Sequence, residues 1–190
     1  MNIYDILHEP TKFTDLATHC SQFINESGGL PVFRNLPTTY SDVQRVKARK
    51  RKAVDGVTET FNQAFQQEAR DLGQRAVYVY GQLAEDSGTG DTEPFYVFPV
   101  NGYKFIYNSE VGQSKHTYQQ ALEQVIEQFA SPTNGIELLI DLLKYTYQSV
   151  DLAEGISAGA EIIVYNIPHY YVVRSSVIDY DTLLDKLKGQ

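Results

Sequence analysis

Three groups of residues, far apart in the chain, carry side chains suited to holding a phosphorylated sugar. Arg34 ends one apolar segment, Glu161 begins another, and the segment RAVYVYG at residues 75–81 contains Tyr78 and Tyr80. An arginine guanidinium binds a phosphate or diphosphate through two parallel hydrogen bonds. A carboxylate can bind a ribose hydroxyl and stabilise a sugar carbon that becomes cationic. If the fold brings these groups into one cleft, they favour chemistry on a nucleotide sugar.

Glu161 is the most informative of these residues. It precedes Ile-Ile-Val at residues 162–164, a run typical of a buried strand, and such a strand does not tolerate an unpaired charge. Gly155 and Gly159 bracket the turn before it, which predicts that Glu161 lies half in and half out of the core. Two simpler interpretations stay open. Glu161 closes a strand into a loop, and Arg34 is the partner in a surface salt bridge.

The elements that must position these residues are mainly strands. Apolar, β-branched and aromatic residues predict strands at residues 30–34, 76–80, 95–99, 103–107, 161–165 and 170–173. The pair Asn101-Gly102 predicts a hairpin turn that joins residues 95–99 to residues 103–107. The acidic, glycine-rich residues 81–93 predict an exposed mobile loop, and residues 166–169, with Pro168, predict a tight turn.

Helices are predicted on both sides of these strands along the chain. Residues 1–29 have an apolar helical face that ends at Ser-Gly-Gly, and apolar spacing predicts further helices at residues 57–72, 117–129, 136–147 and 179–188. Thr117 and Gln120 match a capping box. The sequence therefore predicts a single α+β domain over residues 1–190. Its core, residues 30–175, is a split, mostly antiparallel sheet with peripheral helices, between helical segments at residues 1–29 and 176–190.

Composition narrows the classes of function. With 190 residues and 42% hydrophobic content, the chain suits one domain with a substantial core. The net charge of −8 argues against non-specific nucleic-acid binding. Cys20 is the single cysteine and the four histidines are scattered, so no metal site is predicted, and the acidic residues 85–93 do not match a calcium loop. Without an apolar run of roughly 20 residues or a signal peptide, we expect a soluble protein.

The order of the chemical groups resembles a known family. The segments VFRNL, VKARKRKAVDG, RAVYVYG, FYVFPVNGYKFIYN and YQSVDLAEGISAGAEIIVYNIPHYYVV, which span residues 31–173, are similar to small tailed-phage proteins with the ADP-ribosyltransferase fold. The resemblance implies that a split sheet binds NAD in a cleft. It implies that Arg34 binds the nicotinamide-side ribose or phosphate and that Tyr78 and Tyr80 line the nicotinamide pocket. Glu161 matches the glutamate that stabilises the oxocarbenium-like state as nicotinamide leaves.

The basic run RVKARKRK at residues 45–52 carries six positive charges, and on a helix Arg45, Arg49 and Lys52 would share a face. Three interpretations stay open. The run is a solvated helix that offsets the acidic remainder of the chain, or a docking patch for nucleic acid or an acidic protein. The resemblance adds the third, a phosphate-binding wall beside the NAD cleft in which Arg49 and Arg51 contact the cofactor.

Some residues depart from the family's pattern. Val79-Tyr80-Gly81 stands where a Ser-Thr-Ser-like motif is usual, Asn35 replaces a small residue, and Gly159 stands where arginine-modifying transferases carry Glu or Gln. Modification of arginine is therefore disfavoured. The resemblance implies a phage protein that transfers ADP-ribose from NAD to an unknown macromolecule, or hydrolyses NAD, in the host cytoplasm. The alternative is a catalytically degenerate protein that is a virion component or binds a host factor.

Overall fold

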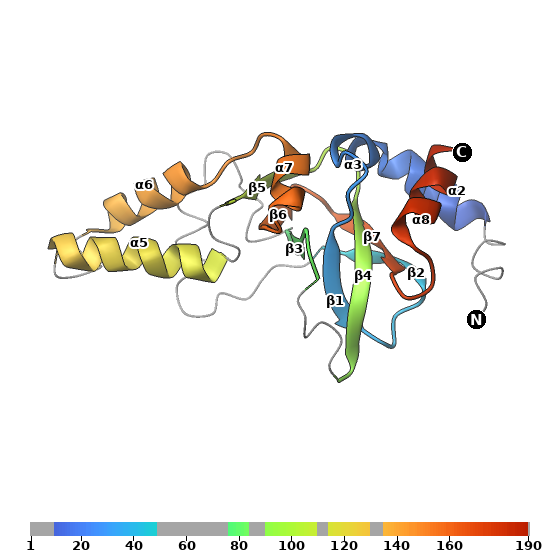
Figure 1. The fold of residues 1–190 in the computed structure, drawn as a ribbon, viewed down its shortest axis with the longest axis horizontal. Coiled ribbons are helices and arrows are strands. Elements are labelled where there is room, and N and C mark those ends of the chain that lie inside the picture. Colours follow the sequence, from blue (N-terminus) through green and yellow to red (C-terminus); the bar gives the residue numbers. More distant parts are fainter. Residues whose placement is uncertain (1–9, 49–75, 84–89, 110–113, 130–134, 190) are drawn as a thin grey trace.

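The chain folds around one antiparallel sheet of seven strands. The structure, a computed structural model, describes residues 10–48, 76–83, 90–109, 114–129 and 135–189 (Figure 1). The strand order in the sheet is β2-β7-β4-β1-β3-β6-β5, and helices lie around it. The predicted single α+β domain with a mostly antiparallel sheet and peripheral helices is confirmed.

The strands and helices have the following bounds. The strands are β1 (Phe33–Pro37), β2 (Val43–Lys47), β3 (Val77–Tyr80), β4 (Thr92–Pro99), β5 (Lys104–Tyr107), β6 (Glu161–Tyr165) and β7 (His169–Arg174). The helices are α2 (Pro10–His19), α3 (Ser21–Glu26), α5 (Ser114–Phe129), α6 (Ile136–Thr146), α7 (Leu152–Ser157) and α8 (Tyr180–Lys188). The predicted strands at residues 76–80, 95–99, 103–107, 161–165 and 170–173 are therefore confirmed to within a few residues, as is the C-terminal helix.

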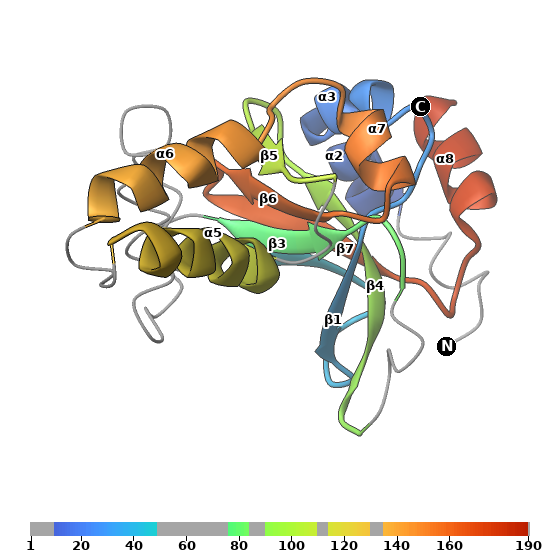
Figure 2. The same cartoon turned by 60° about the vertical axis from the view of Figure 1, so that its left-hand side comes forward.

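The sheet consists of two parts that meet at β1 and β3. Strands β2, β7, β4 and β1 pair along most of their lengths, whereas β1 and β3 are paired through Phe33 opposite Tyr80. In Figure 2, β3, β6 and β5 run across the direction of β1 and β4. Helices α2, α3 and α8 lie beside the first part, and α5 and α6 lie beside the second (Figures 1 and 2). The strands of Arg34, Tyr80 and Glu161, which are β1, β3 and β6, are consecutive at this junction.

A separate hydrophobic cluster attaches α5 and α6 to the second part of the sheet. Val125 of α5 and Leu143 of α6 are fully buried and pack with Ile106 of β5 and Ile163 of β6. The two predicted helices at residues 117–129 and 136–147 are thus confirmed. The predicted capping box at Thr117 is wrong, because α5 already begins at Ser114 and a cap must precede the first helical turn.

The turn at Asn101-Gly102 does not form the predicted hairpin. Gly102 has a left-handed φ of 85°, as a tight turn requires, but β4 pairs with β1 and β7, whereas β5 pairs with β6. Asn101 instead forms hydrogen bonds with residues of α2 and α3. Its backbone N–H donates to the carbonyl of His19 (2.6 Å), and its Oδ1 accepts from the N–H of Gln22 (2.9 Å). The predicted N-terminal helix is accordingly two helices, α2 and α3, with the break at Cys20.

Two expectations for the first 50 residues are wrong. The strand predicted at residues 30–34 is β1, Phe33–Pro37, so Arg34 is its second residue and not its last. Pro37 closes the strand, where its missing N–H costs no ladder hydrogen bond. The solvated helix, one of the three interpretations left open for the basic run, is wrong for its first residues, because Arg45 and Lys47 belong to β2, whose Val46 is buried opposite Tyr170. Arg49, Lys52 and the helix predicted at residues 57–72 lie outside the described residues.

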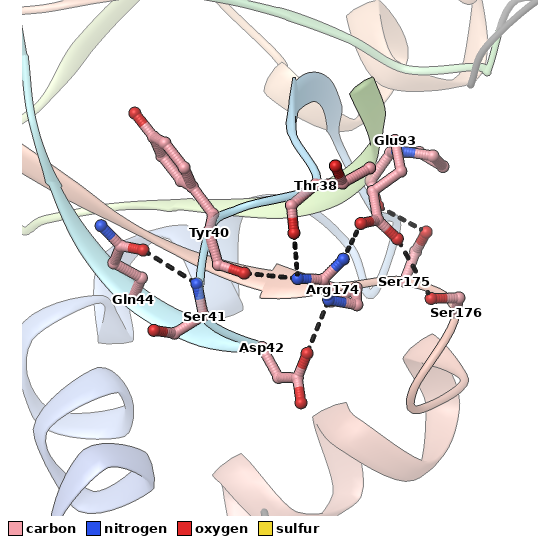
Figure 3. A network of polar contacts seen from close by, with 10 residues as sticks. Thr38, Tyr40, Ser41, Asp42, Gln44, Glu93, Arg174, Ser175 and Ser176 are labelled. Carbon is pink, nitrogen blue, oxygen red and sulfur yellow. Dashed lines mark hydrogen bonds and ion pairs between the residues drawn. The ribbon is translucent and has the colours of Figure 1, made fainter. Parts of the chain in front are cut away.

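Arg174, at the end of β7, joins the first three strands of the sheet and had no place in the sequence prediction (Figure 3). Its Nε lies 2.6 Å from Oδ1 of Asp42, its Nη1 pairs with Glu93, and its Nη2 donates to the carbonyl of Thr38 (3.2 Å). The guanidinium also lies over the Phe95 ring, 5.0 Å from its centre. Glu93, which the sequence placed in an exposed loop, is therefore part of a strand and of this network.

Removing Arg174 is expected to destabilise the fold. In an Arg174→Met chain, the mostly buried carboxylates of Asp42 and Glu93 lose their shared cation, which should lower the free energy of unfolding by about 2 kcal/mol. Urea unfolding of the two chains measures the difference. Arg34→Met is the matched control, because Arg34 has no ion pair among the described residues, and equal losses in both variants would show that the network is not stabilising.

Candidate functional site

Glu161 and Tyr80 lie opposite each other at the ends of two neighbouring strands. The Tyr80 hydroxyl donates to Oε2 of Glu161 across 2.7 Å. Glu161 is 7% exposed, so the prediction that it lies half in and half out of the core is wrong. A buried carboxylate requires hydrogen-bond donors, and the hydroxyl of Tyr80 supplies one. The structure therefore brings together two of the predicted site residues.

A short helix and two glycines fix the backbone before Glu161. Asp151 caps α7 by accepting a hydrogen bond from the N–H of Glu154, and Gly159 then reverses the chain with a left-handed φ of 69°. Gly81, the residue after Tyr80, donates its N–H to the carbonyl of Ala160 (3.3 Å). The turn predicted at Gly159 is confirmed. Gly155 was predicted in the same turn and instead lies inside α7, against the ring of Tyr107.

Tyr78 belongs to the same strand face as Tyr80 but has other neighbours. It is two residues earlier in β3, opposite Ile163, and it packs against the hydrophobic cluster beneath α5 and α6. Tyr78 is half-buried, as is Tyr80. The two tyrosines therefore line one face of β3, with Tyr80 at the end that carries Glu161.

Arg34 does not share that face. It lies on β1, the strand next to β3, and it is opposite Phe95 of β4. Phe33, the residue before it, is the one opposite Tyr80. Because successive residues of a strand project to opposite faces, Arg34 projects from the other side of β1. It is half-buried, and within the described ranges no carboxylate pairs with it, so the predicted surface salt bridge is not found there.

The basic run begins far from Glu161 in the strand order. Arg45 and Lys47 lie on β2, at one end of the sheet, and β7, β4, β1 and β3 separate β2 from β6. Arg49 and Arg51, predicted to contact the cofactor, lie outside the described residues. The two described cations of the run therefore belong to a different region of the sheet from Tyr80 and Glu161.

The pair of Tyr80 and Glu161 is suited to binding a hydroxyl group and to stabilising positive charge. Tyr80 orients the carboxylate through one oxygen, and an ionised carboxylate carries several acceptor positions. In the part of the chain that the structure describes, no group of three or more His, Cys, Asp or Glu side chains could hold a metal ion. Within the same part, no helix has the length and apolar character to cross a membrane.

His169, the last residue of the turn predicted at residues 166–169, is the first residue of β7 and contacts Arg45. Nη2 of Arg45 lies 3.1 Å from Nδ1 of His169, and a guanidinium only donates, so Nδ1 is the acceptor. Burial lowers the pKa of His169 below its ordinary value of 6.5, and the positive charges of Arg45 and His19 lower it further. The folded state therefore favours the neutral imidazole.

This lowered pKa predicts a pH dependence of stability. The unfolded chain binds a proton at His169 more readily than the folded chain, so the stabilisation is fully present above pH 6.5 and is lost as the pH falls below that value. Replacement of His169 by glutamine should make the free energy of unfolding less dependent on pH in this range. Urea unfolding of both chains above and below pH 6.5 tests this, and parallel curves for the two proteins would contradict it.

Comparison with known proteins gives no match: no family model, no characterised protein and no solved structure is significantly similar to this chain. The sequence placed Gly81 in the motif after Tyr80 but gave no sign of its close approach to α7, and Arg174 was missed altogether. The signal for Arg174 was its position directly after the apolar run Tyr-Tyr-Val-Val, where a charge marks the end of a buried strand.

Proposed function

We propose that the chain is a phage-encoded ADP-ribosyltransferase-like protein that uses NAD as its substrate. It would transfer ADP-ribose to a host or phage macromolecule in the cytoplasm of the infected cell. In this proposal Glu161 is the catalytic carboxylate, and Tyr78 and Tyr80 line the nicotinamide pocket. Arg34, with Arg49 and Arg51 of the basic run, would bind the phosphates.

The observation that carries this proposal is the hydrogen bond between Tyr80 and Glu161. The resemblance assigned these two residues to one site from segments about 80 positions apart, and their strands are direct neighbours with the two residues in register. The strand of Arg34 is the next neighbour of β3. The three strands that the resemblance selected are thus consecutive in the sheet, which supports a shared site at their junction.

The proposed chemistry is cleavage of the bond between nicotinamide and ribose. The bonding electrons leave with nicotinamide, which becomes neutral, and positive charge develops on the ribose C1′ and its ring oxygen. A carboxylate held in place before the reaction stabilises that charge without reorganising. Tyr80 would act as a positioning residue by fixing one oxygen of Glu161. The acceptor nucleophile, or water, then bonds to C1′ and loses its proton.

Titration with NAD tests the proposal directly. The purified chain is titrated with NAD by calorimetry, and free nicotinamide is measured in the same samples. Saturable binding together with nicotinamide release above the rate in buffer is the expected result. Absence of binding at millimolar NAD would contradict the proposal. Binding without nicotinamide release would exclude both transfer of ADP-ribose and hydrolysis of NAD, and would indicate a protein that only binds NAD.

A second candidate is the catalytically degenerate phage protein, either a virion component or a binder of a host factor. The observation that favours it is the alternation in β1, which directs Phe33 and not Arg34 to the side of Tyr80. A transferase of this kind would need its phosphate-binding arginine on the same side as its glutamate. Failure to bind NAD, together with recovery of the chain in purified virions, would favour this candidate.

A further inference from the structure

A second cluster of polar side chains lies on β2 and β7, away from the candidate site. Arg45 is opposite Tyr171 and Lys47 is opposite His169, so these four residues project from one face of the sheet. His19 of α2 stacks on Tyr171, with 6.4 Å between the ring centres, and His169 meets the same ring edge-on at 5.9 Å. Three elements therefore bring two cations and two imidazoles around one tyrosine. We call His19, Arg45, Lys47 and His169 the β2–β7 cationic cluster.

The β2–β7 cationic cluster is open to solvent. His19, Arg45 and Lys47 are exposed, and His169 is half-buried. Tyr171 beneath them is mostly buried and forms the floor. Arg45 places one donor on Nδ1 of His169, and a guanidinium has five N–H groups in all. Nδ1 of His19 donates to the carbonyl of Asp15 (2.7 Å), so its Nε2 is the nitrogen not engaged by this bond.

Within the described residues, no carboxylate forms an ion pair with the cluster. The ion pairs found among the described residues are those of Arg174, and none involves Arg45, Lys47 or either histidine. The chain carries 24 acidic and 16 basic residues, so carboxylates are in excess and unpaired cations at one place are unexpected. Burial raises the pKa of Tyr171, and the negative charge of Asp15 on α2 raises it further. Asp15 itself forms no ion pair with the described residues of the cluster. Cations held together without counter-charge favour an anionic ligand.

We propose that the β2–β7 cationic cluster binds the phosphate group of a small phosphorylated molecule. Arginine and lysine donate charge-assisted hydrogen bonds to phosphate oxygens, and His169, whose Nδ1 accepts from Arg45, can donate from Nε2. The ligand is small because the cluster is compact and the whole chain carries a net charge of −8, which opposes a long polyanion that would extend beyond these residues. Four strands separate β2 from β6, so this site does not depend on the proposed NAD chemistry.

Pyrophosphate is the probe for this site. Calorimetry at constant ionic strength is expected to show one saturable event, and Arg45→Gln or Lys47→Gln should each weaken the apparent affinity about tenfold. Lys104→Gln is the matched control, since Lys104 is an exposed lysine on β5, at the other end of the sheet. Glu161→Gln should leave pyrophosphate binding unchanged, which separates this proposal from the proposed function.

Several results would overturn the proposal. One is the absence of pyrophosphate binding at millimolar concentration. Another is an equal loss of pyrophosphate affinity in Arg45→Gln and Lys104→Gln, which would show a general effect of the charge of the chain. If a single-stranded oligonucleotide binds at the cluster and pyrophosphate does not displace it, the cluster is a nucleic-acid-binding surface and not a site for a small phosphorylated molecule. Thermal unfolding checks that the variants are folded, and Lys47→Gln retains the contact between Arg45 and His169 if Arg45→Gln proves unstable.

Discussion

A Glu161→Gln chain is expected to release nicotinamide from NAD at least about 100-fold more slowly than the wild-type chain. Glutamine has the same shape, and its carbonyl oxygen can still accept the hydrogen bond from Tyr80, so the fold should be preserved. What is lost is the negative charge that would stabilise the cationic ribose. Because charge develops in the transition state, NAD binding should change much less than the rate.

The control for this experiment is Glu123→Gln, which changes the same charge at an exposed position on α5. Its rate should equal that of the wild-type chain. A Tyr80→Phe chain should fall between the two, because it keeps the charge of Glu161 and loses its positioning partner. If Glu161→Gln retains the wild-type rate, Glu161 is not the catalytic carboxylate and the activity has another source.

Replacing Gly81 by alanine is expected to lower the free energy of unfolding by about 3 kcal/mol or more. A Cβ at Gly81 would lie 2.1 Å from the carbonyl oxygen of Ile156 and 2.7 Å from its carbon. Both atoms belong to the backbone of α7, which cannot rotate away as a side chain can. The helix would have to move, and with it the turn at Gly159 that leads to Glu161.

Chemical unfolding of Gly81→Ala beside Gly189→Ala measures this effect. Gly189 has an ordinary φ of −86°, and its nearest contact to an added Cβ is 3.3 Å, so the control should change stability by less than about 0.5 kcal/mol. Equal stability of the two variants would mean that α7 and β3 separate easily. The approach of α7 to Gly81 would then be no constraint on the position of Glu161.

The local sequence predicted most of the helices and strands, but it did not predict which strands pair with one another in the sheet. The run Glu-Ile-Ile-Val-Tyr defined β6 to the residue, because a continuous apolar stretch after glycine has few other structures open to it. In contrast, Asn101-Gly102 correctly indicated a turn and wrongly indicated a hairpin. The turn depends on two residues, whereas strand pairing depends on surfaces distant in the chain. The helix considered for the basic run fails at Arg45 and Lys47 for the same reason, since the strand that contains them pairs with β7.

The candidate site was predictable in part. Glu161 could be selected because a carboxylate at the start of a buried strand requires an explanation, whereas Tyr80 was selected through the family resemblance. The face from which Arg34 projects could not be predicted, since a strand boundary displaced by a few residues leaves the register with β4 open. The network of Arg174 was equally out of reach, because Asp42 and Glu93 come from two other parts of the chain.

The strand order also has a consequence for how the chain reaches its folded state. Among the described strands no two form a hairpin, and β2 is placed at the sheet edge beside β7, with Val43 opposite Val173. Such a topology has a high contact order, so folding should be slow for a domain of this size. During synthesis on the ribosome, β2 emerges long before β7, which is its one neighbour in the described sheet, so the backbone groups of β2 stay without that pairing until translation is nearly finished. Because unpaired strands favour pairing with other chains, refolding at high protein concentration is expected to produce more aggregate than refolding at low concentration.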